Sequence, residues 1–154
     1  MQPQPTRSPG QPPLTILLAD DDPDDRMMAA DALAEAHIAN PLVCVEDGKE
    51  LLDYLHGTGE YAEHPPPLPG LILLDLNMPR IDGREALARL KETPHLRRIP
   101  VIILTTSEAE EDIFRTYDIG VNSFITKPVS FAGLVDVMKG LRHYWLEIVA
   151  LPAA

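Results

Sequence analysis

The chain has 154 residues, 45% of them hydrophobic, which is enough for one well-buried core and too little for two ordinary domains. Its formal net charge of -11 argues against non-specific binding to nucleic acid or to an anionic membrane, because both require concentrated lysine and arginine, and it is compatible with divalent cations. No apolar run approaches the roughly 18 residues of a membrane span. An N-terminus unlike a secretory signal and the single Cys44 favour a reducing cytoplasm.

Residues 1–13 contain five prolines and are expected to form a disordered lead-in, because proline lacks the amide donor that a regular helix needs. The folded domain is expected to span residues 14–149, followed by a short tail at 150–154. Short apolar runs predict strands at Leu14–Ala19, Leu42–Glu46, Leu71–Leu74, Val101–Leu104 and Ser123–Ile125. Helical spacing or composition predicts helices at Asp24–Ala36, Lys49–Leu55, Gly83–Glu92, Ala109–Tyr117 and Phe131–Leu146.

This strict alternation predicts an α/β fold in which a parallel five-stranded sheet is doubly wound, with helices on both faces. Burial on both faces explains why Leu71–Leu74 is apolar throughout. In such folds ligands bind beyond the carboxyl ends of the strands, so the residues there are the functional candidates. The segment 57–70, with prolines at 65–67 and 69, is expected to be a long surface loop that is either functional or mobile.

Three aspartates, Asp20, Asp21 and Asp22, follow the first predicted strand and precede Pro23, which favours a helix start. Two interpretations are open. Aspartate is a preferred helix N-cap, because its carboxylate accepts hydrogen bonds from exposed amides and suits the helix dipole. Alternatively, the clustered carboxylates, which repel one another, hold a cation.

Asp75 ends the third predicted strand and is expected to face Asp20 and Asp21. Carboxylates brought together are unfavourable unless a cation neutralises them, which predicts a hard divalent ion. Mg2+ prefers octahedral oxygen ligation, so two carboxylates and a backbone carbonyl would leave room for a phosphoryl oxygen. Thr105 and Lys127, after the fourth and fifth strands, bring a hydroxyl donor and a positive charge to the same rim.

The motifs LLADDDP, LLDLNMPRIDG, LTTSE and TKP together resemble those of bacterial two-component response regulator receiver domains, and the resemblance covers roughly residues 14–146. It implies the flavodoxin-like receiver fold and a Mg2+-dependent phosphorylation site. The implied metal ligands are Asp20, Asp21, Asp75 and the backbone carbonyl of Asn77. The implied phosphoryl site comprises the phosphoacceptor Asp75 with Thr105 and Lys127.

The same resemblance implies a donor, a phosphohistidine on a sensor histidine kinase. The receiver would catalyse its own phosphorylation and dephosphorylation without being a classical enzyme, and Asn77 and Ser107 occupy the positions that tune hydrolysis in the family. Phosphorylation would draw the Thr105 hydroxyl inward and couple it to the aromatic residue Phe124. Plain core packing is the alternative role of Phe124.

The last predicted helix has more apolar residues than one buried stripe requires. Phe131, Val135, Met138, Trp145 and Val149 have core-like spacing, and a neighbouring stripe comprises Leu134, Val137, Leu141, Tyr144, Ile148 and Leu151. The second stripe predicts a homodimer or partner surface, and a single broad core face with a frayed tail is the alternative. The loop at 57–70 and the ending WLEIVALP resemble stand-alone regulators that partner phytochrome-type kinases, so the output is expected to be protein binding without an output domain.

Two other functions remain as alternatives. Aspartyl-phosphate phosphatases also use a strand-end aspartate and Mg2+, but they resemble a pattern with a second aspartate two residues on, where this chain has Asn77. A pseudo-receiver that only binds partners would not need the full set of acidic residues with Thr105 and Lys127. Neither common glycine-rich nucleotide-binding motif occurs in the sequence.

Overall fold

The computed structural model describes residues 14–75, 78, 80, 81, 83–105, 123–126 and 130–149. Its strands are β1 (Ile16–Ala19), β2 (Leu42–Val45), β3 (Leu71–Asp75), β4 (Val101–Thr105) and β5 (Ser123–Thr126). Its helices are α1 (Pro23–Glu35), α2 (Gly48–His56), the short 3-10 helix η1 (Gly59–Tyr61), α3 (Gly83–Glu92) and α5 (Phe131–Val149). The lead-in at 1–13, the predicted helix at Ala109–Tyr117 and the tail at 150–154 lie outside the described residues.

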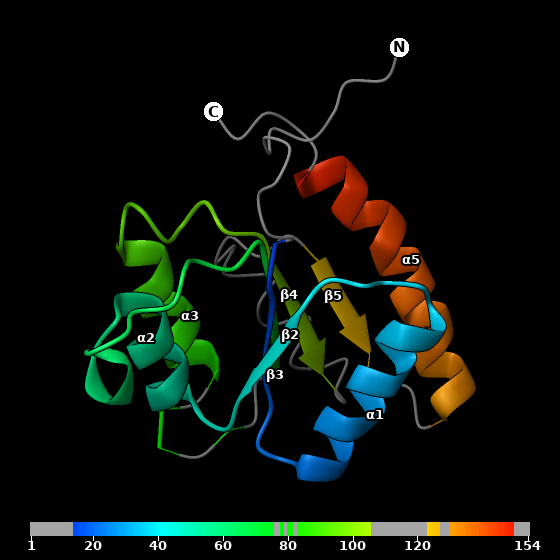
Figure 1. The fold of residues 1–154 in the computed structure, drawn as a ribbon, viewed down its shortest axis with the longest axis horizontal. Helices are drawn as coiled ribbons and strands as arrows, with labels where there is room; N and C mark the ends of the chain where they lie inside the picture. The colour runs from blue at the N-terminus through cyan, green and yellow to red at the C-terminus, as the bar shows by residue number, and fades with distance from the viewer. Residues whose placement is uncertain are drawn as a thin grey trace.

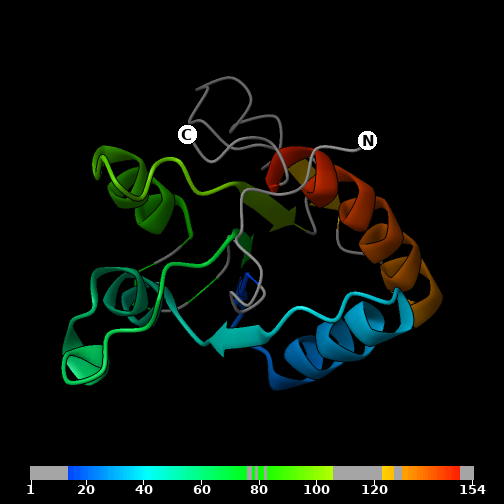
Figure 2. The ribbon, with the colours of Figure 1, turned by 45° about the horizontal axis from the view of Figure 1, so that its top comes forward.

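The five strands form one parallel sheet in the order β2-β1-β3-β4-β5. α1 and α5 cover one face of the sheet, and α2 and α3 cover the other (Figure 1, Figure 2). The predicted doubly wound α/β fold is confirmed. The chain leaves β1 toward β2 on one side and returns to β3 on the other, so the carboxyl ends of β1 and β3 flank the point where ligands bind in such sheets.

Alternate residues of the central strands supply two separate cores. Leu17 and Ile72 face α2 and α3, whereas Leu18 and Leu73 face α1 and α5, and all four side chains are buried. Each fully buried side chain of this size stabilises the fold by about 1.5–3 kcal/mol relative to exposure. Burial on both faces is therefore the physical reason for the unbroken apolar runs in β1 and β3.

The long loop after α2 is tied back to that helix. Gly57 ends α2 in the left-handed conformation, with φ of 66°, and η1 follows within the loop. The Tyr61 hydroxyl donates to Glu50 Oε2 over 2.8 Å, and its ring lies edge-on to Tyr54 at a centroid distance of 5.2 Å. The first part of the predicted surface loop is thus a packed extension of α2.

Most boundaries lie within two residues of the prediction, and α5 ends at Val149, three residues beyond the predicted Leu146. β1 begins at Ile16, two residues later than predicted. Before it, the Thr15 carbonyl accepts from Gly70 N at 2.9 Å, and the Leu14 carbonyl accepts from the Asn40 side chain (Nδ2) at 3.0 Å. α1 ends at Glu35, and His37 beyond it has a positive φ of 61°. Among the described residues, no helix is both long and apolar enough to cross a bilayer.

Candidate functional site

The site is built on the carboxyl ends of β1 and β3. These strands are adjacent and parallel, with Ala19 beside Leu74, so the next residues, Asp20 and Asp75, emerge at the same level. The Asp20 and Asp75 residues are 1% and 7% exposed, whereas Asp21 is exposed. One carboxylate oxygen from each of the three aspartates lies within 4.8 Å of the others.

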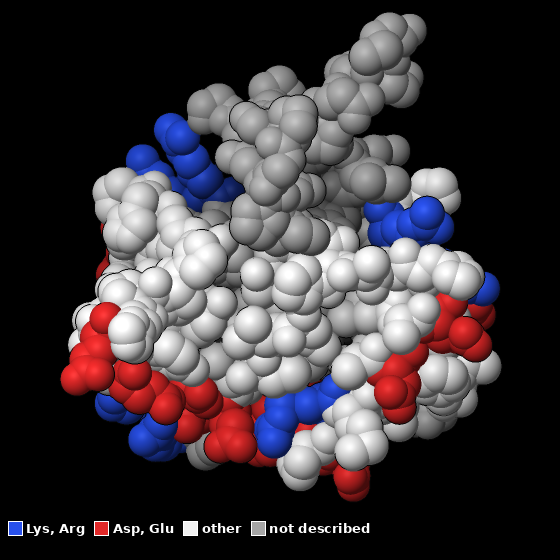
Figure 3. Space-filling model, viewed as in Figure 1, with Lys and Arg blue, Asp and Glu red and all other residues white. Residues whose placement is uncertain are grey.

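Aspartate and glutamate side chains gather along the lower edge of the molecule in Figure 3, which is the edge toward which β4 and β5 point in Figure 1. The predicted trio, which comes from separate parts of the chain, meets at the carboxyl ends of β1 and β3. Water at this rim reaches Asp21, while the other two aspartates lie against the core.

The backbone and one carboxylate oxygen of Asp20 are held by hydrogen bonds. Its Oδ1 accepts from the backbone N–H of Asp22 at 3.0 Å, and its amide donates to the Val45 carbonyl at 3.0 Å. Its carbonyl accepts from Arg26 Nη1 at 2.8 Å, and Arg26 also pairs with Glu46 at 3.4 Å. Sequence analysis did not single out Arg26, because its partners are identified only by the fold.

The two interpretations of the aspartate cluster apply to different residues. Asp22 is the N-cap of α1, and its Oδ1 accepts from the backbone N–H of Asp24 at 2.8 Å and of Asp25 at 3.4 Å, with Pro23 in the first turn. The carboxylates of Asp20 and Asp21 instead face Asp75. Helix capping therefore explains one of the three aspartates and leaves two for another role.

The donor set fits a hard divalent cation. Three carboxylate oxygens within 4.8 Å of one another concentrate negative charge where two of the residues are buried, and oxygen is the ligand that Mg2+ prefers. A divalent ion bound there would supply positive charge to neutralise the carboxylates and to attract a phosphoryl oxygen. Asp20, Asp21 and Asp75 are the described residues that could hold it.

The ends of β4 and β5 reach the same rim. Asp75 pairs in register with Leu104, and Thr105 pairs with Thr126. Thr105 is the last residue of β4, and its side chain lies outside the described residues. Phe124 lies in β5, where its backbone pairs with that of Ile103, and its side chain also lies outside the described residues.

The remaining predicted residues of the phosphoryl site, Asn77, Lys127 and Ser107, lie outside the described residues. The loop that contains Asn77 is described at three neighbouring positions. Met78 is buried in the core, Arg80 forms an ion pair with Asp47 of 2.8 Å, and Ile81 packs against the core beneath α2.

This ion pair was missed by the sequence analysis. The Arg80 guanidinium donates to both carboxylate oxygens of Asp47, from Nε at 2.9 Å to Oδ2 and from Nη2 at 3.0 Å to Oδ1. Burial alone would raise the pKa of Asp47, but the hydrogen bonds and charge of Arg80, with backbone hydrogen bonds at the start of α2, outweigh it and lower the pKa. The only sequence signal was an aspartate placed to cap α2.

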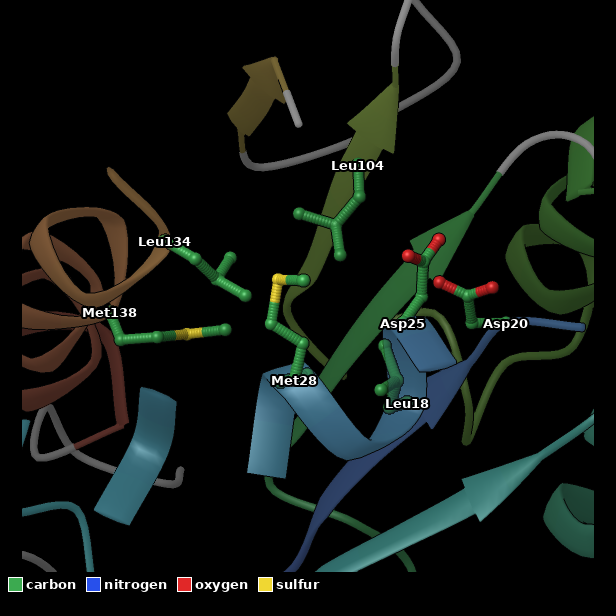
Figure 4. Close-up of a pocket in the computed structure, with 8 residues that line it drawn as sticks. Leu18, Asp20, Asp25, Met28, Leu104, Leu134 and Met138 are labelled. Carbon is green, nitrogen blue, oxygen red and sulfur yellow. The ribbon is translucent and has the colours of Figure 1, made fainter. Parts of the chain in front are cut away.

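A small cavity of about 40 Å³ adjoins the site on the α1 and α5 face. In Figure 4, Met28 of α1 and Leu134 and Met138 of α5 point into a common space, with the Asp20 carboxylate at its edge. A cavity of this size accommodates about one water molecule. The acidic site and the packing of α5 on α1 are therefore next to each other.

The predicted interface stripe on α5 is corrected by this packing. Leu134 and Leu141 are 8% and 3% exposed and belong to the core beneath α1, together with Val135 and Met138. They cannot form an exposed partner surface, because one broad face of α5 is turned toward α1 and the sheet. Val137 is half-buried.

Three other residues of the last predicted helix complete this picture. The side chains of Tyr144 and Ile148 lie outside the described residues. Phe131, given core-like spacing by the sequence, is 42% exposed.

Comparison with known proteins identifies the family. The model of the response regulator receiver domain matches residues 16–139. The chain is 42% identical to response regulator Rcp1 of Synechocystis sp. over 143 residues, which cover 93% of this chain and 96% of that protein.

Two crystal structures are similar over nearly the whole chain. The phosphorylated cyanobacterial phytochrome response regulator RcpA is 43% identical with a TM-score of 0.80, covering 92% of this chain and 99% of that one. The Mn2+-bound form of response regulator Rcp1 is 41% identical with a TM-score of 0.79, covering 92% and 100%. The site and these likenesses are consistent with phosphoryl acceptance from a histidine kinase. The chain belongs to the response regulator receiver domain family of two-component systems.

Proposed function

We propose that Asp75 of this protein accepts a phosphoryl group from a sensor histidine kinase in a reaction that requires Mg2+. The observation that supports this proposal is the meeting of Asp20, Asp21 and Asp75, with carboxylate oxygens within 4.8 Å of one another at the carboxyl edge of the sheet. Asp20, Asp21, Asp75 and the backbone carbonyl of Asn77 are the proposed metal ligands. Asp75 is also the proposed nucleophile.

The proposed reaction is an in-line transfer. An Asp75 carboxylate oxygen attacks the phosphorus of the phosphohistidine, an O–P bond forms, and the P–N bond breaks with its electron pair leaving on the imidazole. Lys127 and Thr105 bind phosphoryl oxygens in this proposal. Water later hydrolyses the acyl phosphate to inorganic phosphate and the Asp75 carboxylate, and both steps are catalysed by the receiver itself.

The output proposed is a change in protein contacts. Movement of the Thr105 hydroxyl toward the phosphoryl group would be coupled to Phe124 in β5. Similarity to phytochrome and bacteriophytochrome response regulators supports a phytochrome-type kinase as the partner. A cytoplasmic site of action is in keeping with the free Cys44.

We also propose a homodimer through α5, with a smaller interface than the sequence predicted. With Leu134 and Leu141 in the core, the surface would be built from Val137, Tyr144 and Ile148. Light scattering with and without acetyl phosphate should give the mass of a dimer for the wild-type protein in at least one of the two states. The variants Tyr144→Ala and Ile148→Ala should give the mass of a monomer. A wild-type protein that is monomeric in both states would remove the dimer.

The central test uses acetyl phosphate as a small phosphoryl donor. Incubation with Mg2+ should add one hydroxylamine-sensitive phosphoryl group, located at Asp75 by mass spectrometry. Asp75→Asn should abolish the label, and chelation of Mg2+ should do the same in the wild type. Asp22→Asn is the matched control, because it makes the same change in the same cluster while asparagine still caps α1. A label on another residue, or none, would overturn the proposal.

A further inference from the structure

The backbone that follows Asp75 is docked on the N-terminus of α2. Arg80 reaches Asp47 with two hydrogen bonds, of 2.9 and 3.0 Å, in the bidentate geometry that fixes orientation as well as distance. On one side of this contact the Met78 side chain is buried in the core. On the other side the Ile81 carbonyl lies so close to Gly48 that a Cβ there would be 1.9 Å from the oxygen.

Arg80 holds an unfavourable backbone conformation to make this contact. Its φ is 65°, in the left-handed region that residues with a Cβ rarely adopt. Such strain persists only where the surroundings over-determine it, and it concentrates at functional sites. The Asp47 carboxylate is well suited to impose it, because its Oδ1 also accepts from the Glu50 backbone N–H at 2.8 Å and is thereby fixed at the helix start.

We propose that Asp47 and Arg80 are positioning residues for the metal site, which hold the segment after Asp75 so that its backbone carbonyl at Asn77 can bind Mg2+. This inference rests on the proposed function. Arg80 lies three residues after Asn77 in the chain, so the anchor is at most about 10 Å of extended backbone away. Asp75, the last residue of β3, is the described residue that precedes this segment.

Charge alone would have the opposite effect. Arg80 is a cation on a chain with a formal net charge of -11, so its removal makes the potential of the protein more negative and should, through charge alone, tighten the binding of a divalent ion. Loss of positioning should weaken that binding. The sign of the change in Mg2+ affinity therefore separates the two roles.

The test compares Arg80→Asn with the wild-type chain in calorimetric titrations with Mg2+. Asparagine tolerates the left-handed conformation, so the variant loses the guanidinium without adding backbone strain. We expect the dissociation constant for Mg2+ to rise about tenfold, the lower end of the effect of outer-sphere changes at metal sites. Arg80→Lys, which keeps the charge but lacks the planar fork, should fall between wild type and Arg80→Asn.

Arg89→Gln is the matched control, because it also removes one arginine from an ion pair, with Glu85 on α3, and should leave Mg2+ affinity unchanged. A kinetic readout follows the same logic. In acetyl phosphate reactions, Arg80→Asn should raise the Mg2+ concentration for half-maximal rate more than it lowers the maximal rate. Wild-type or tighter Mg2+ binding by Arg80→Asn would overturn the inference while leaving the proposed function intact, whereas absence of Mg2+ binding by the wild type would overturn both.

Discussion

Replacing Gly48 with alanine should destabilise the protein, although alanine is the better helix former. Gly48 is the first residue of α2, and its position is set by a backbone neighbour. A Cβ there would lie 1.9 Å from the Ile81 carbonyl oxygen, 2.7 Å from the carbonyl carbon and 2.9 Å from the Ile81 Cβ. Because two of these atoms belong to the backbone, relief requires movement of the β3–α3 loop.

The magnitude follows from two opposing contributions. Overpacking of a buried contact costs about 1–3 kcal/mol, and the value here should be near the upper end because backbone must shift. Alanine in place of glycine returns up to about 1 kcal/mol of helix preference. The net loss is roughly 2 kcal/mol, which for a chain of this size lowers the melting temperature by roughly 4–8 °C.

Gly140→Ala supplies the matched control for this prediction. Gly140 lies within α5, and a Cβ added there would meet nothing within 4 Å. The same substitution should therefore stabilise the protein by about 0.5–1 kcal/mol. Thermal unfolding followed by circular dichroism would measure both variants, and a Gly48→Ala protein that melts at or above the wild-type temperature would refute the packing argument.

Three further predictions concern the contacts of α2 and α5. The pKa of Asp47 is lowered in the folded state, so its pairing with Arg80 stabilises the fold above the unfolded pKa of about 3.9. This stabilisation is lost as the pH falls through the folded pKa. Asp47→Asn should therefore lower the free energy of unfolding, measured in urea, at neutral pH, and its difference from the wild type should shrink below roughly pH 4. Tyr61→Phe should cost about 1–2 kcal/mol in the same assay, because the hydroxyl that donates to Glu50 is removed. Leu141→Ala should cost about 2–5 kcal/mol as a core truncation, and light scattering should show an unchanged solution mass.

The fold and the acidic trio could be predicted because local patterns determine them. The unbroken apolar run of β3 required burial on both faces, and parallel strands that end at one edge brought Asp75 to Asp20. Contacts between distant residues were not predictable in the same way. Arg80 and Asp47 are 33 positions apart, and neither residue type indicates which partner the other will pair with.

The error on α5 has a similar origin. Helical spacing shows which residues share a stripe, but the width of the buried face depends on how the helix meets its neighbours. α5 packs against both α1 and the sheet, so Leu134 and Leu141 are buried beside Val135 and Met138. A second apolar stripe next to the first therefore indicated a wider core contact in the described part of the helix.

The helices on the two faces of the sheet contact the two chain segments that follow β1 and β3. On one face, α1 fixes Asp20 through the Arg26 contact with its carbonyl. On the other face, α2 holds the loop after Asp75 through Asp47. Arg26 also reaches Glu46, whose amide donates to Glu50 Oε1 at 2.8 Å, so the two supports are joined around the end of β2.

The sheet itself sets the distance between the acidic strand ends, because the register of β1 and β3 is independent of either helix. Loss of one support should therefore loosen the metal site without dispersing Asp20 and Asp75. This division explains why Arg80→Asn is expected to weaken Mg2+ binding by about tenfold and not abolish it. Removal of a carboxylate of the trio, in contrast, would take away one of the proposed ligands itself.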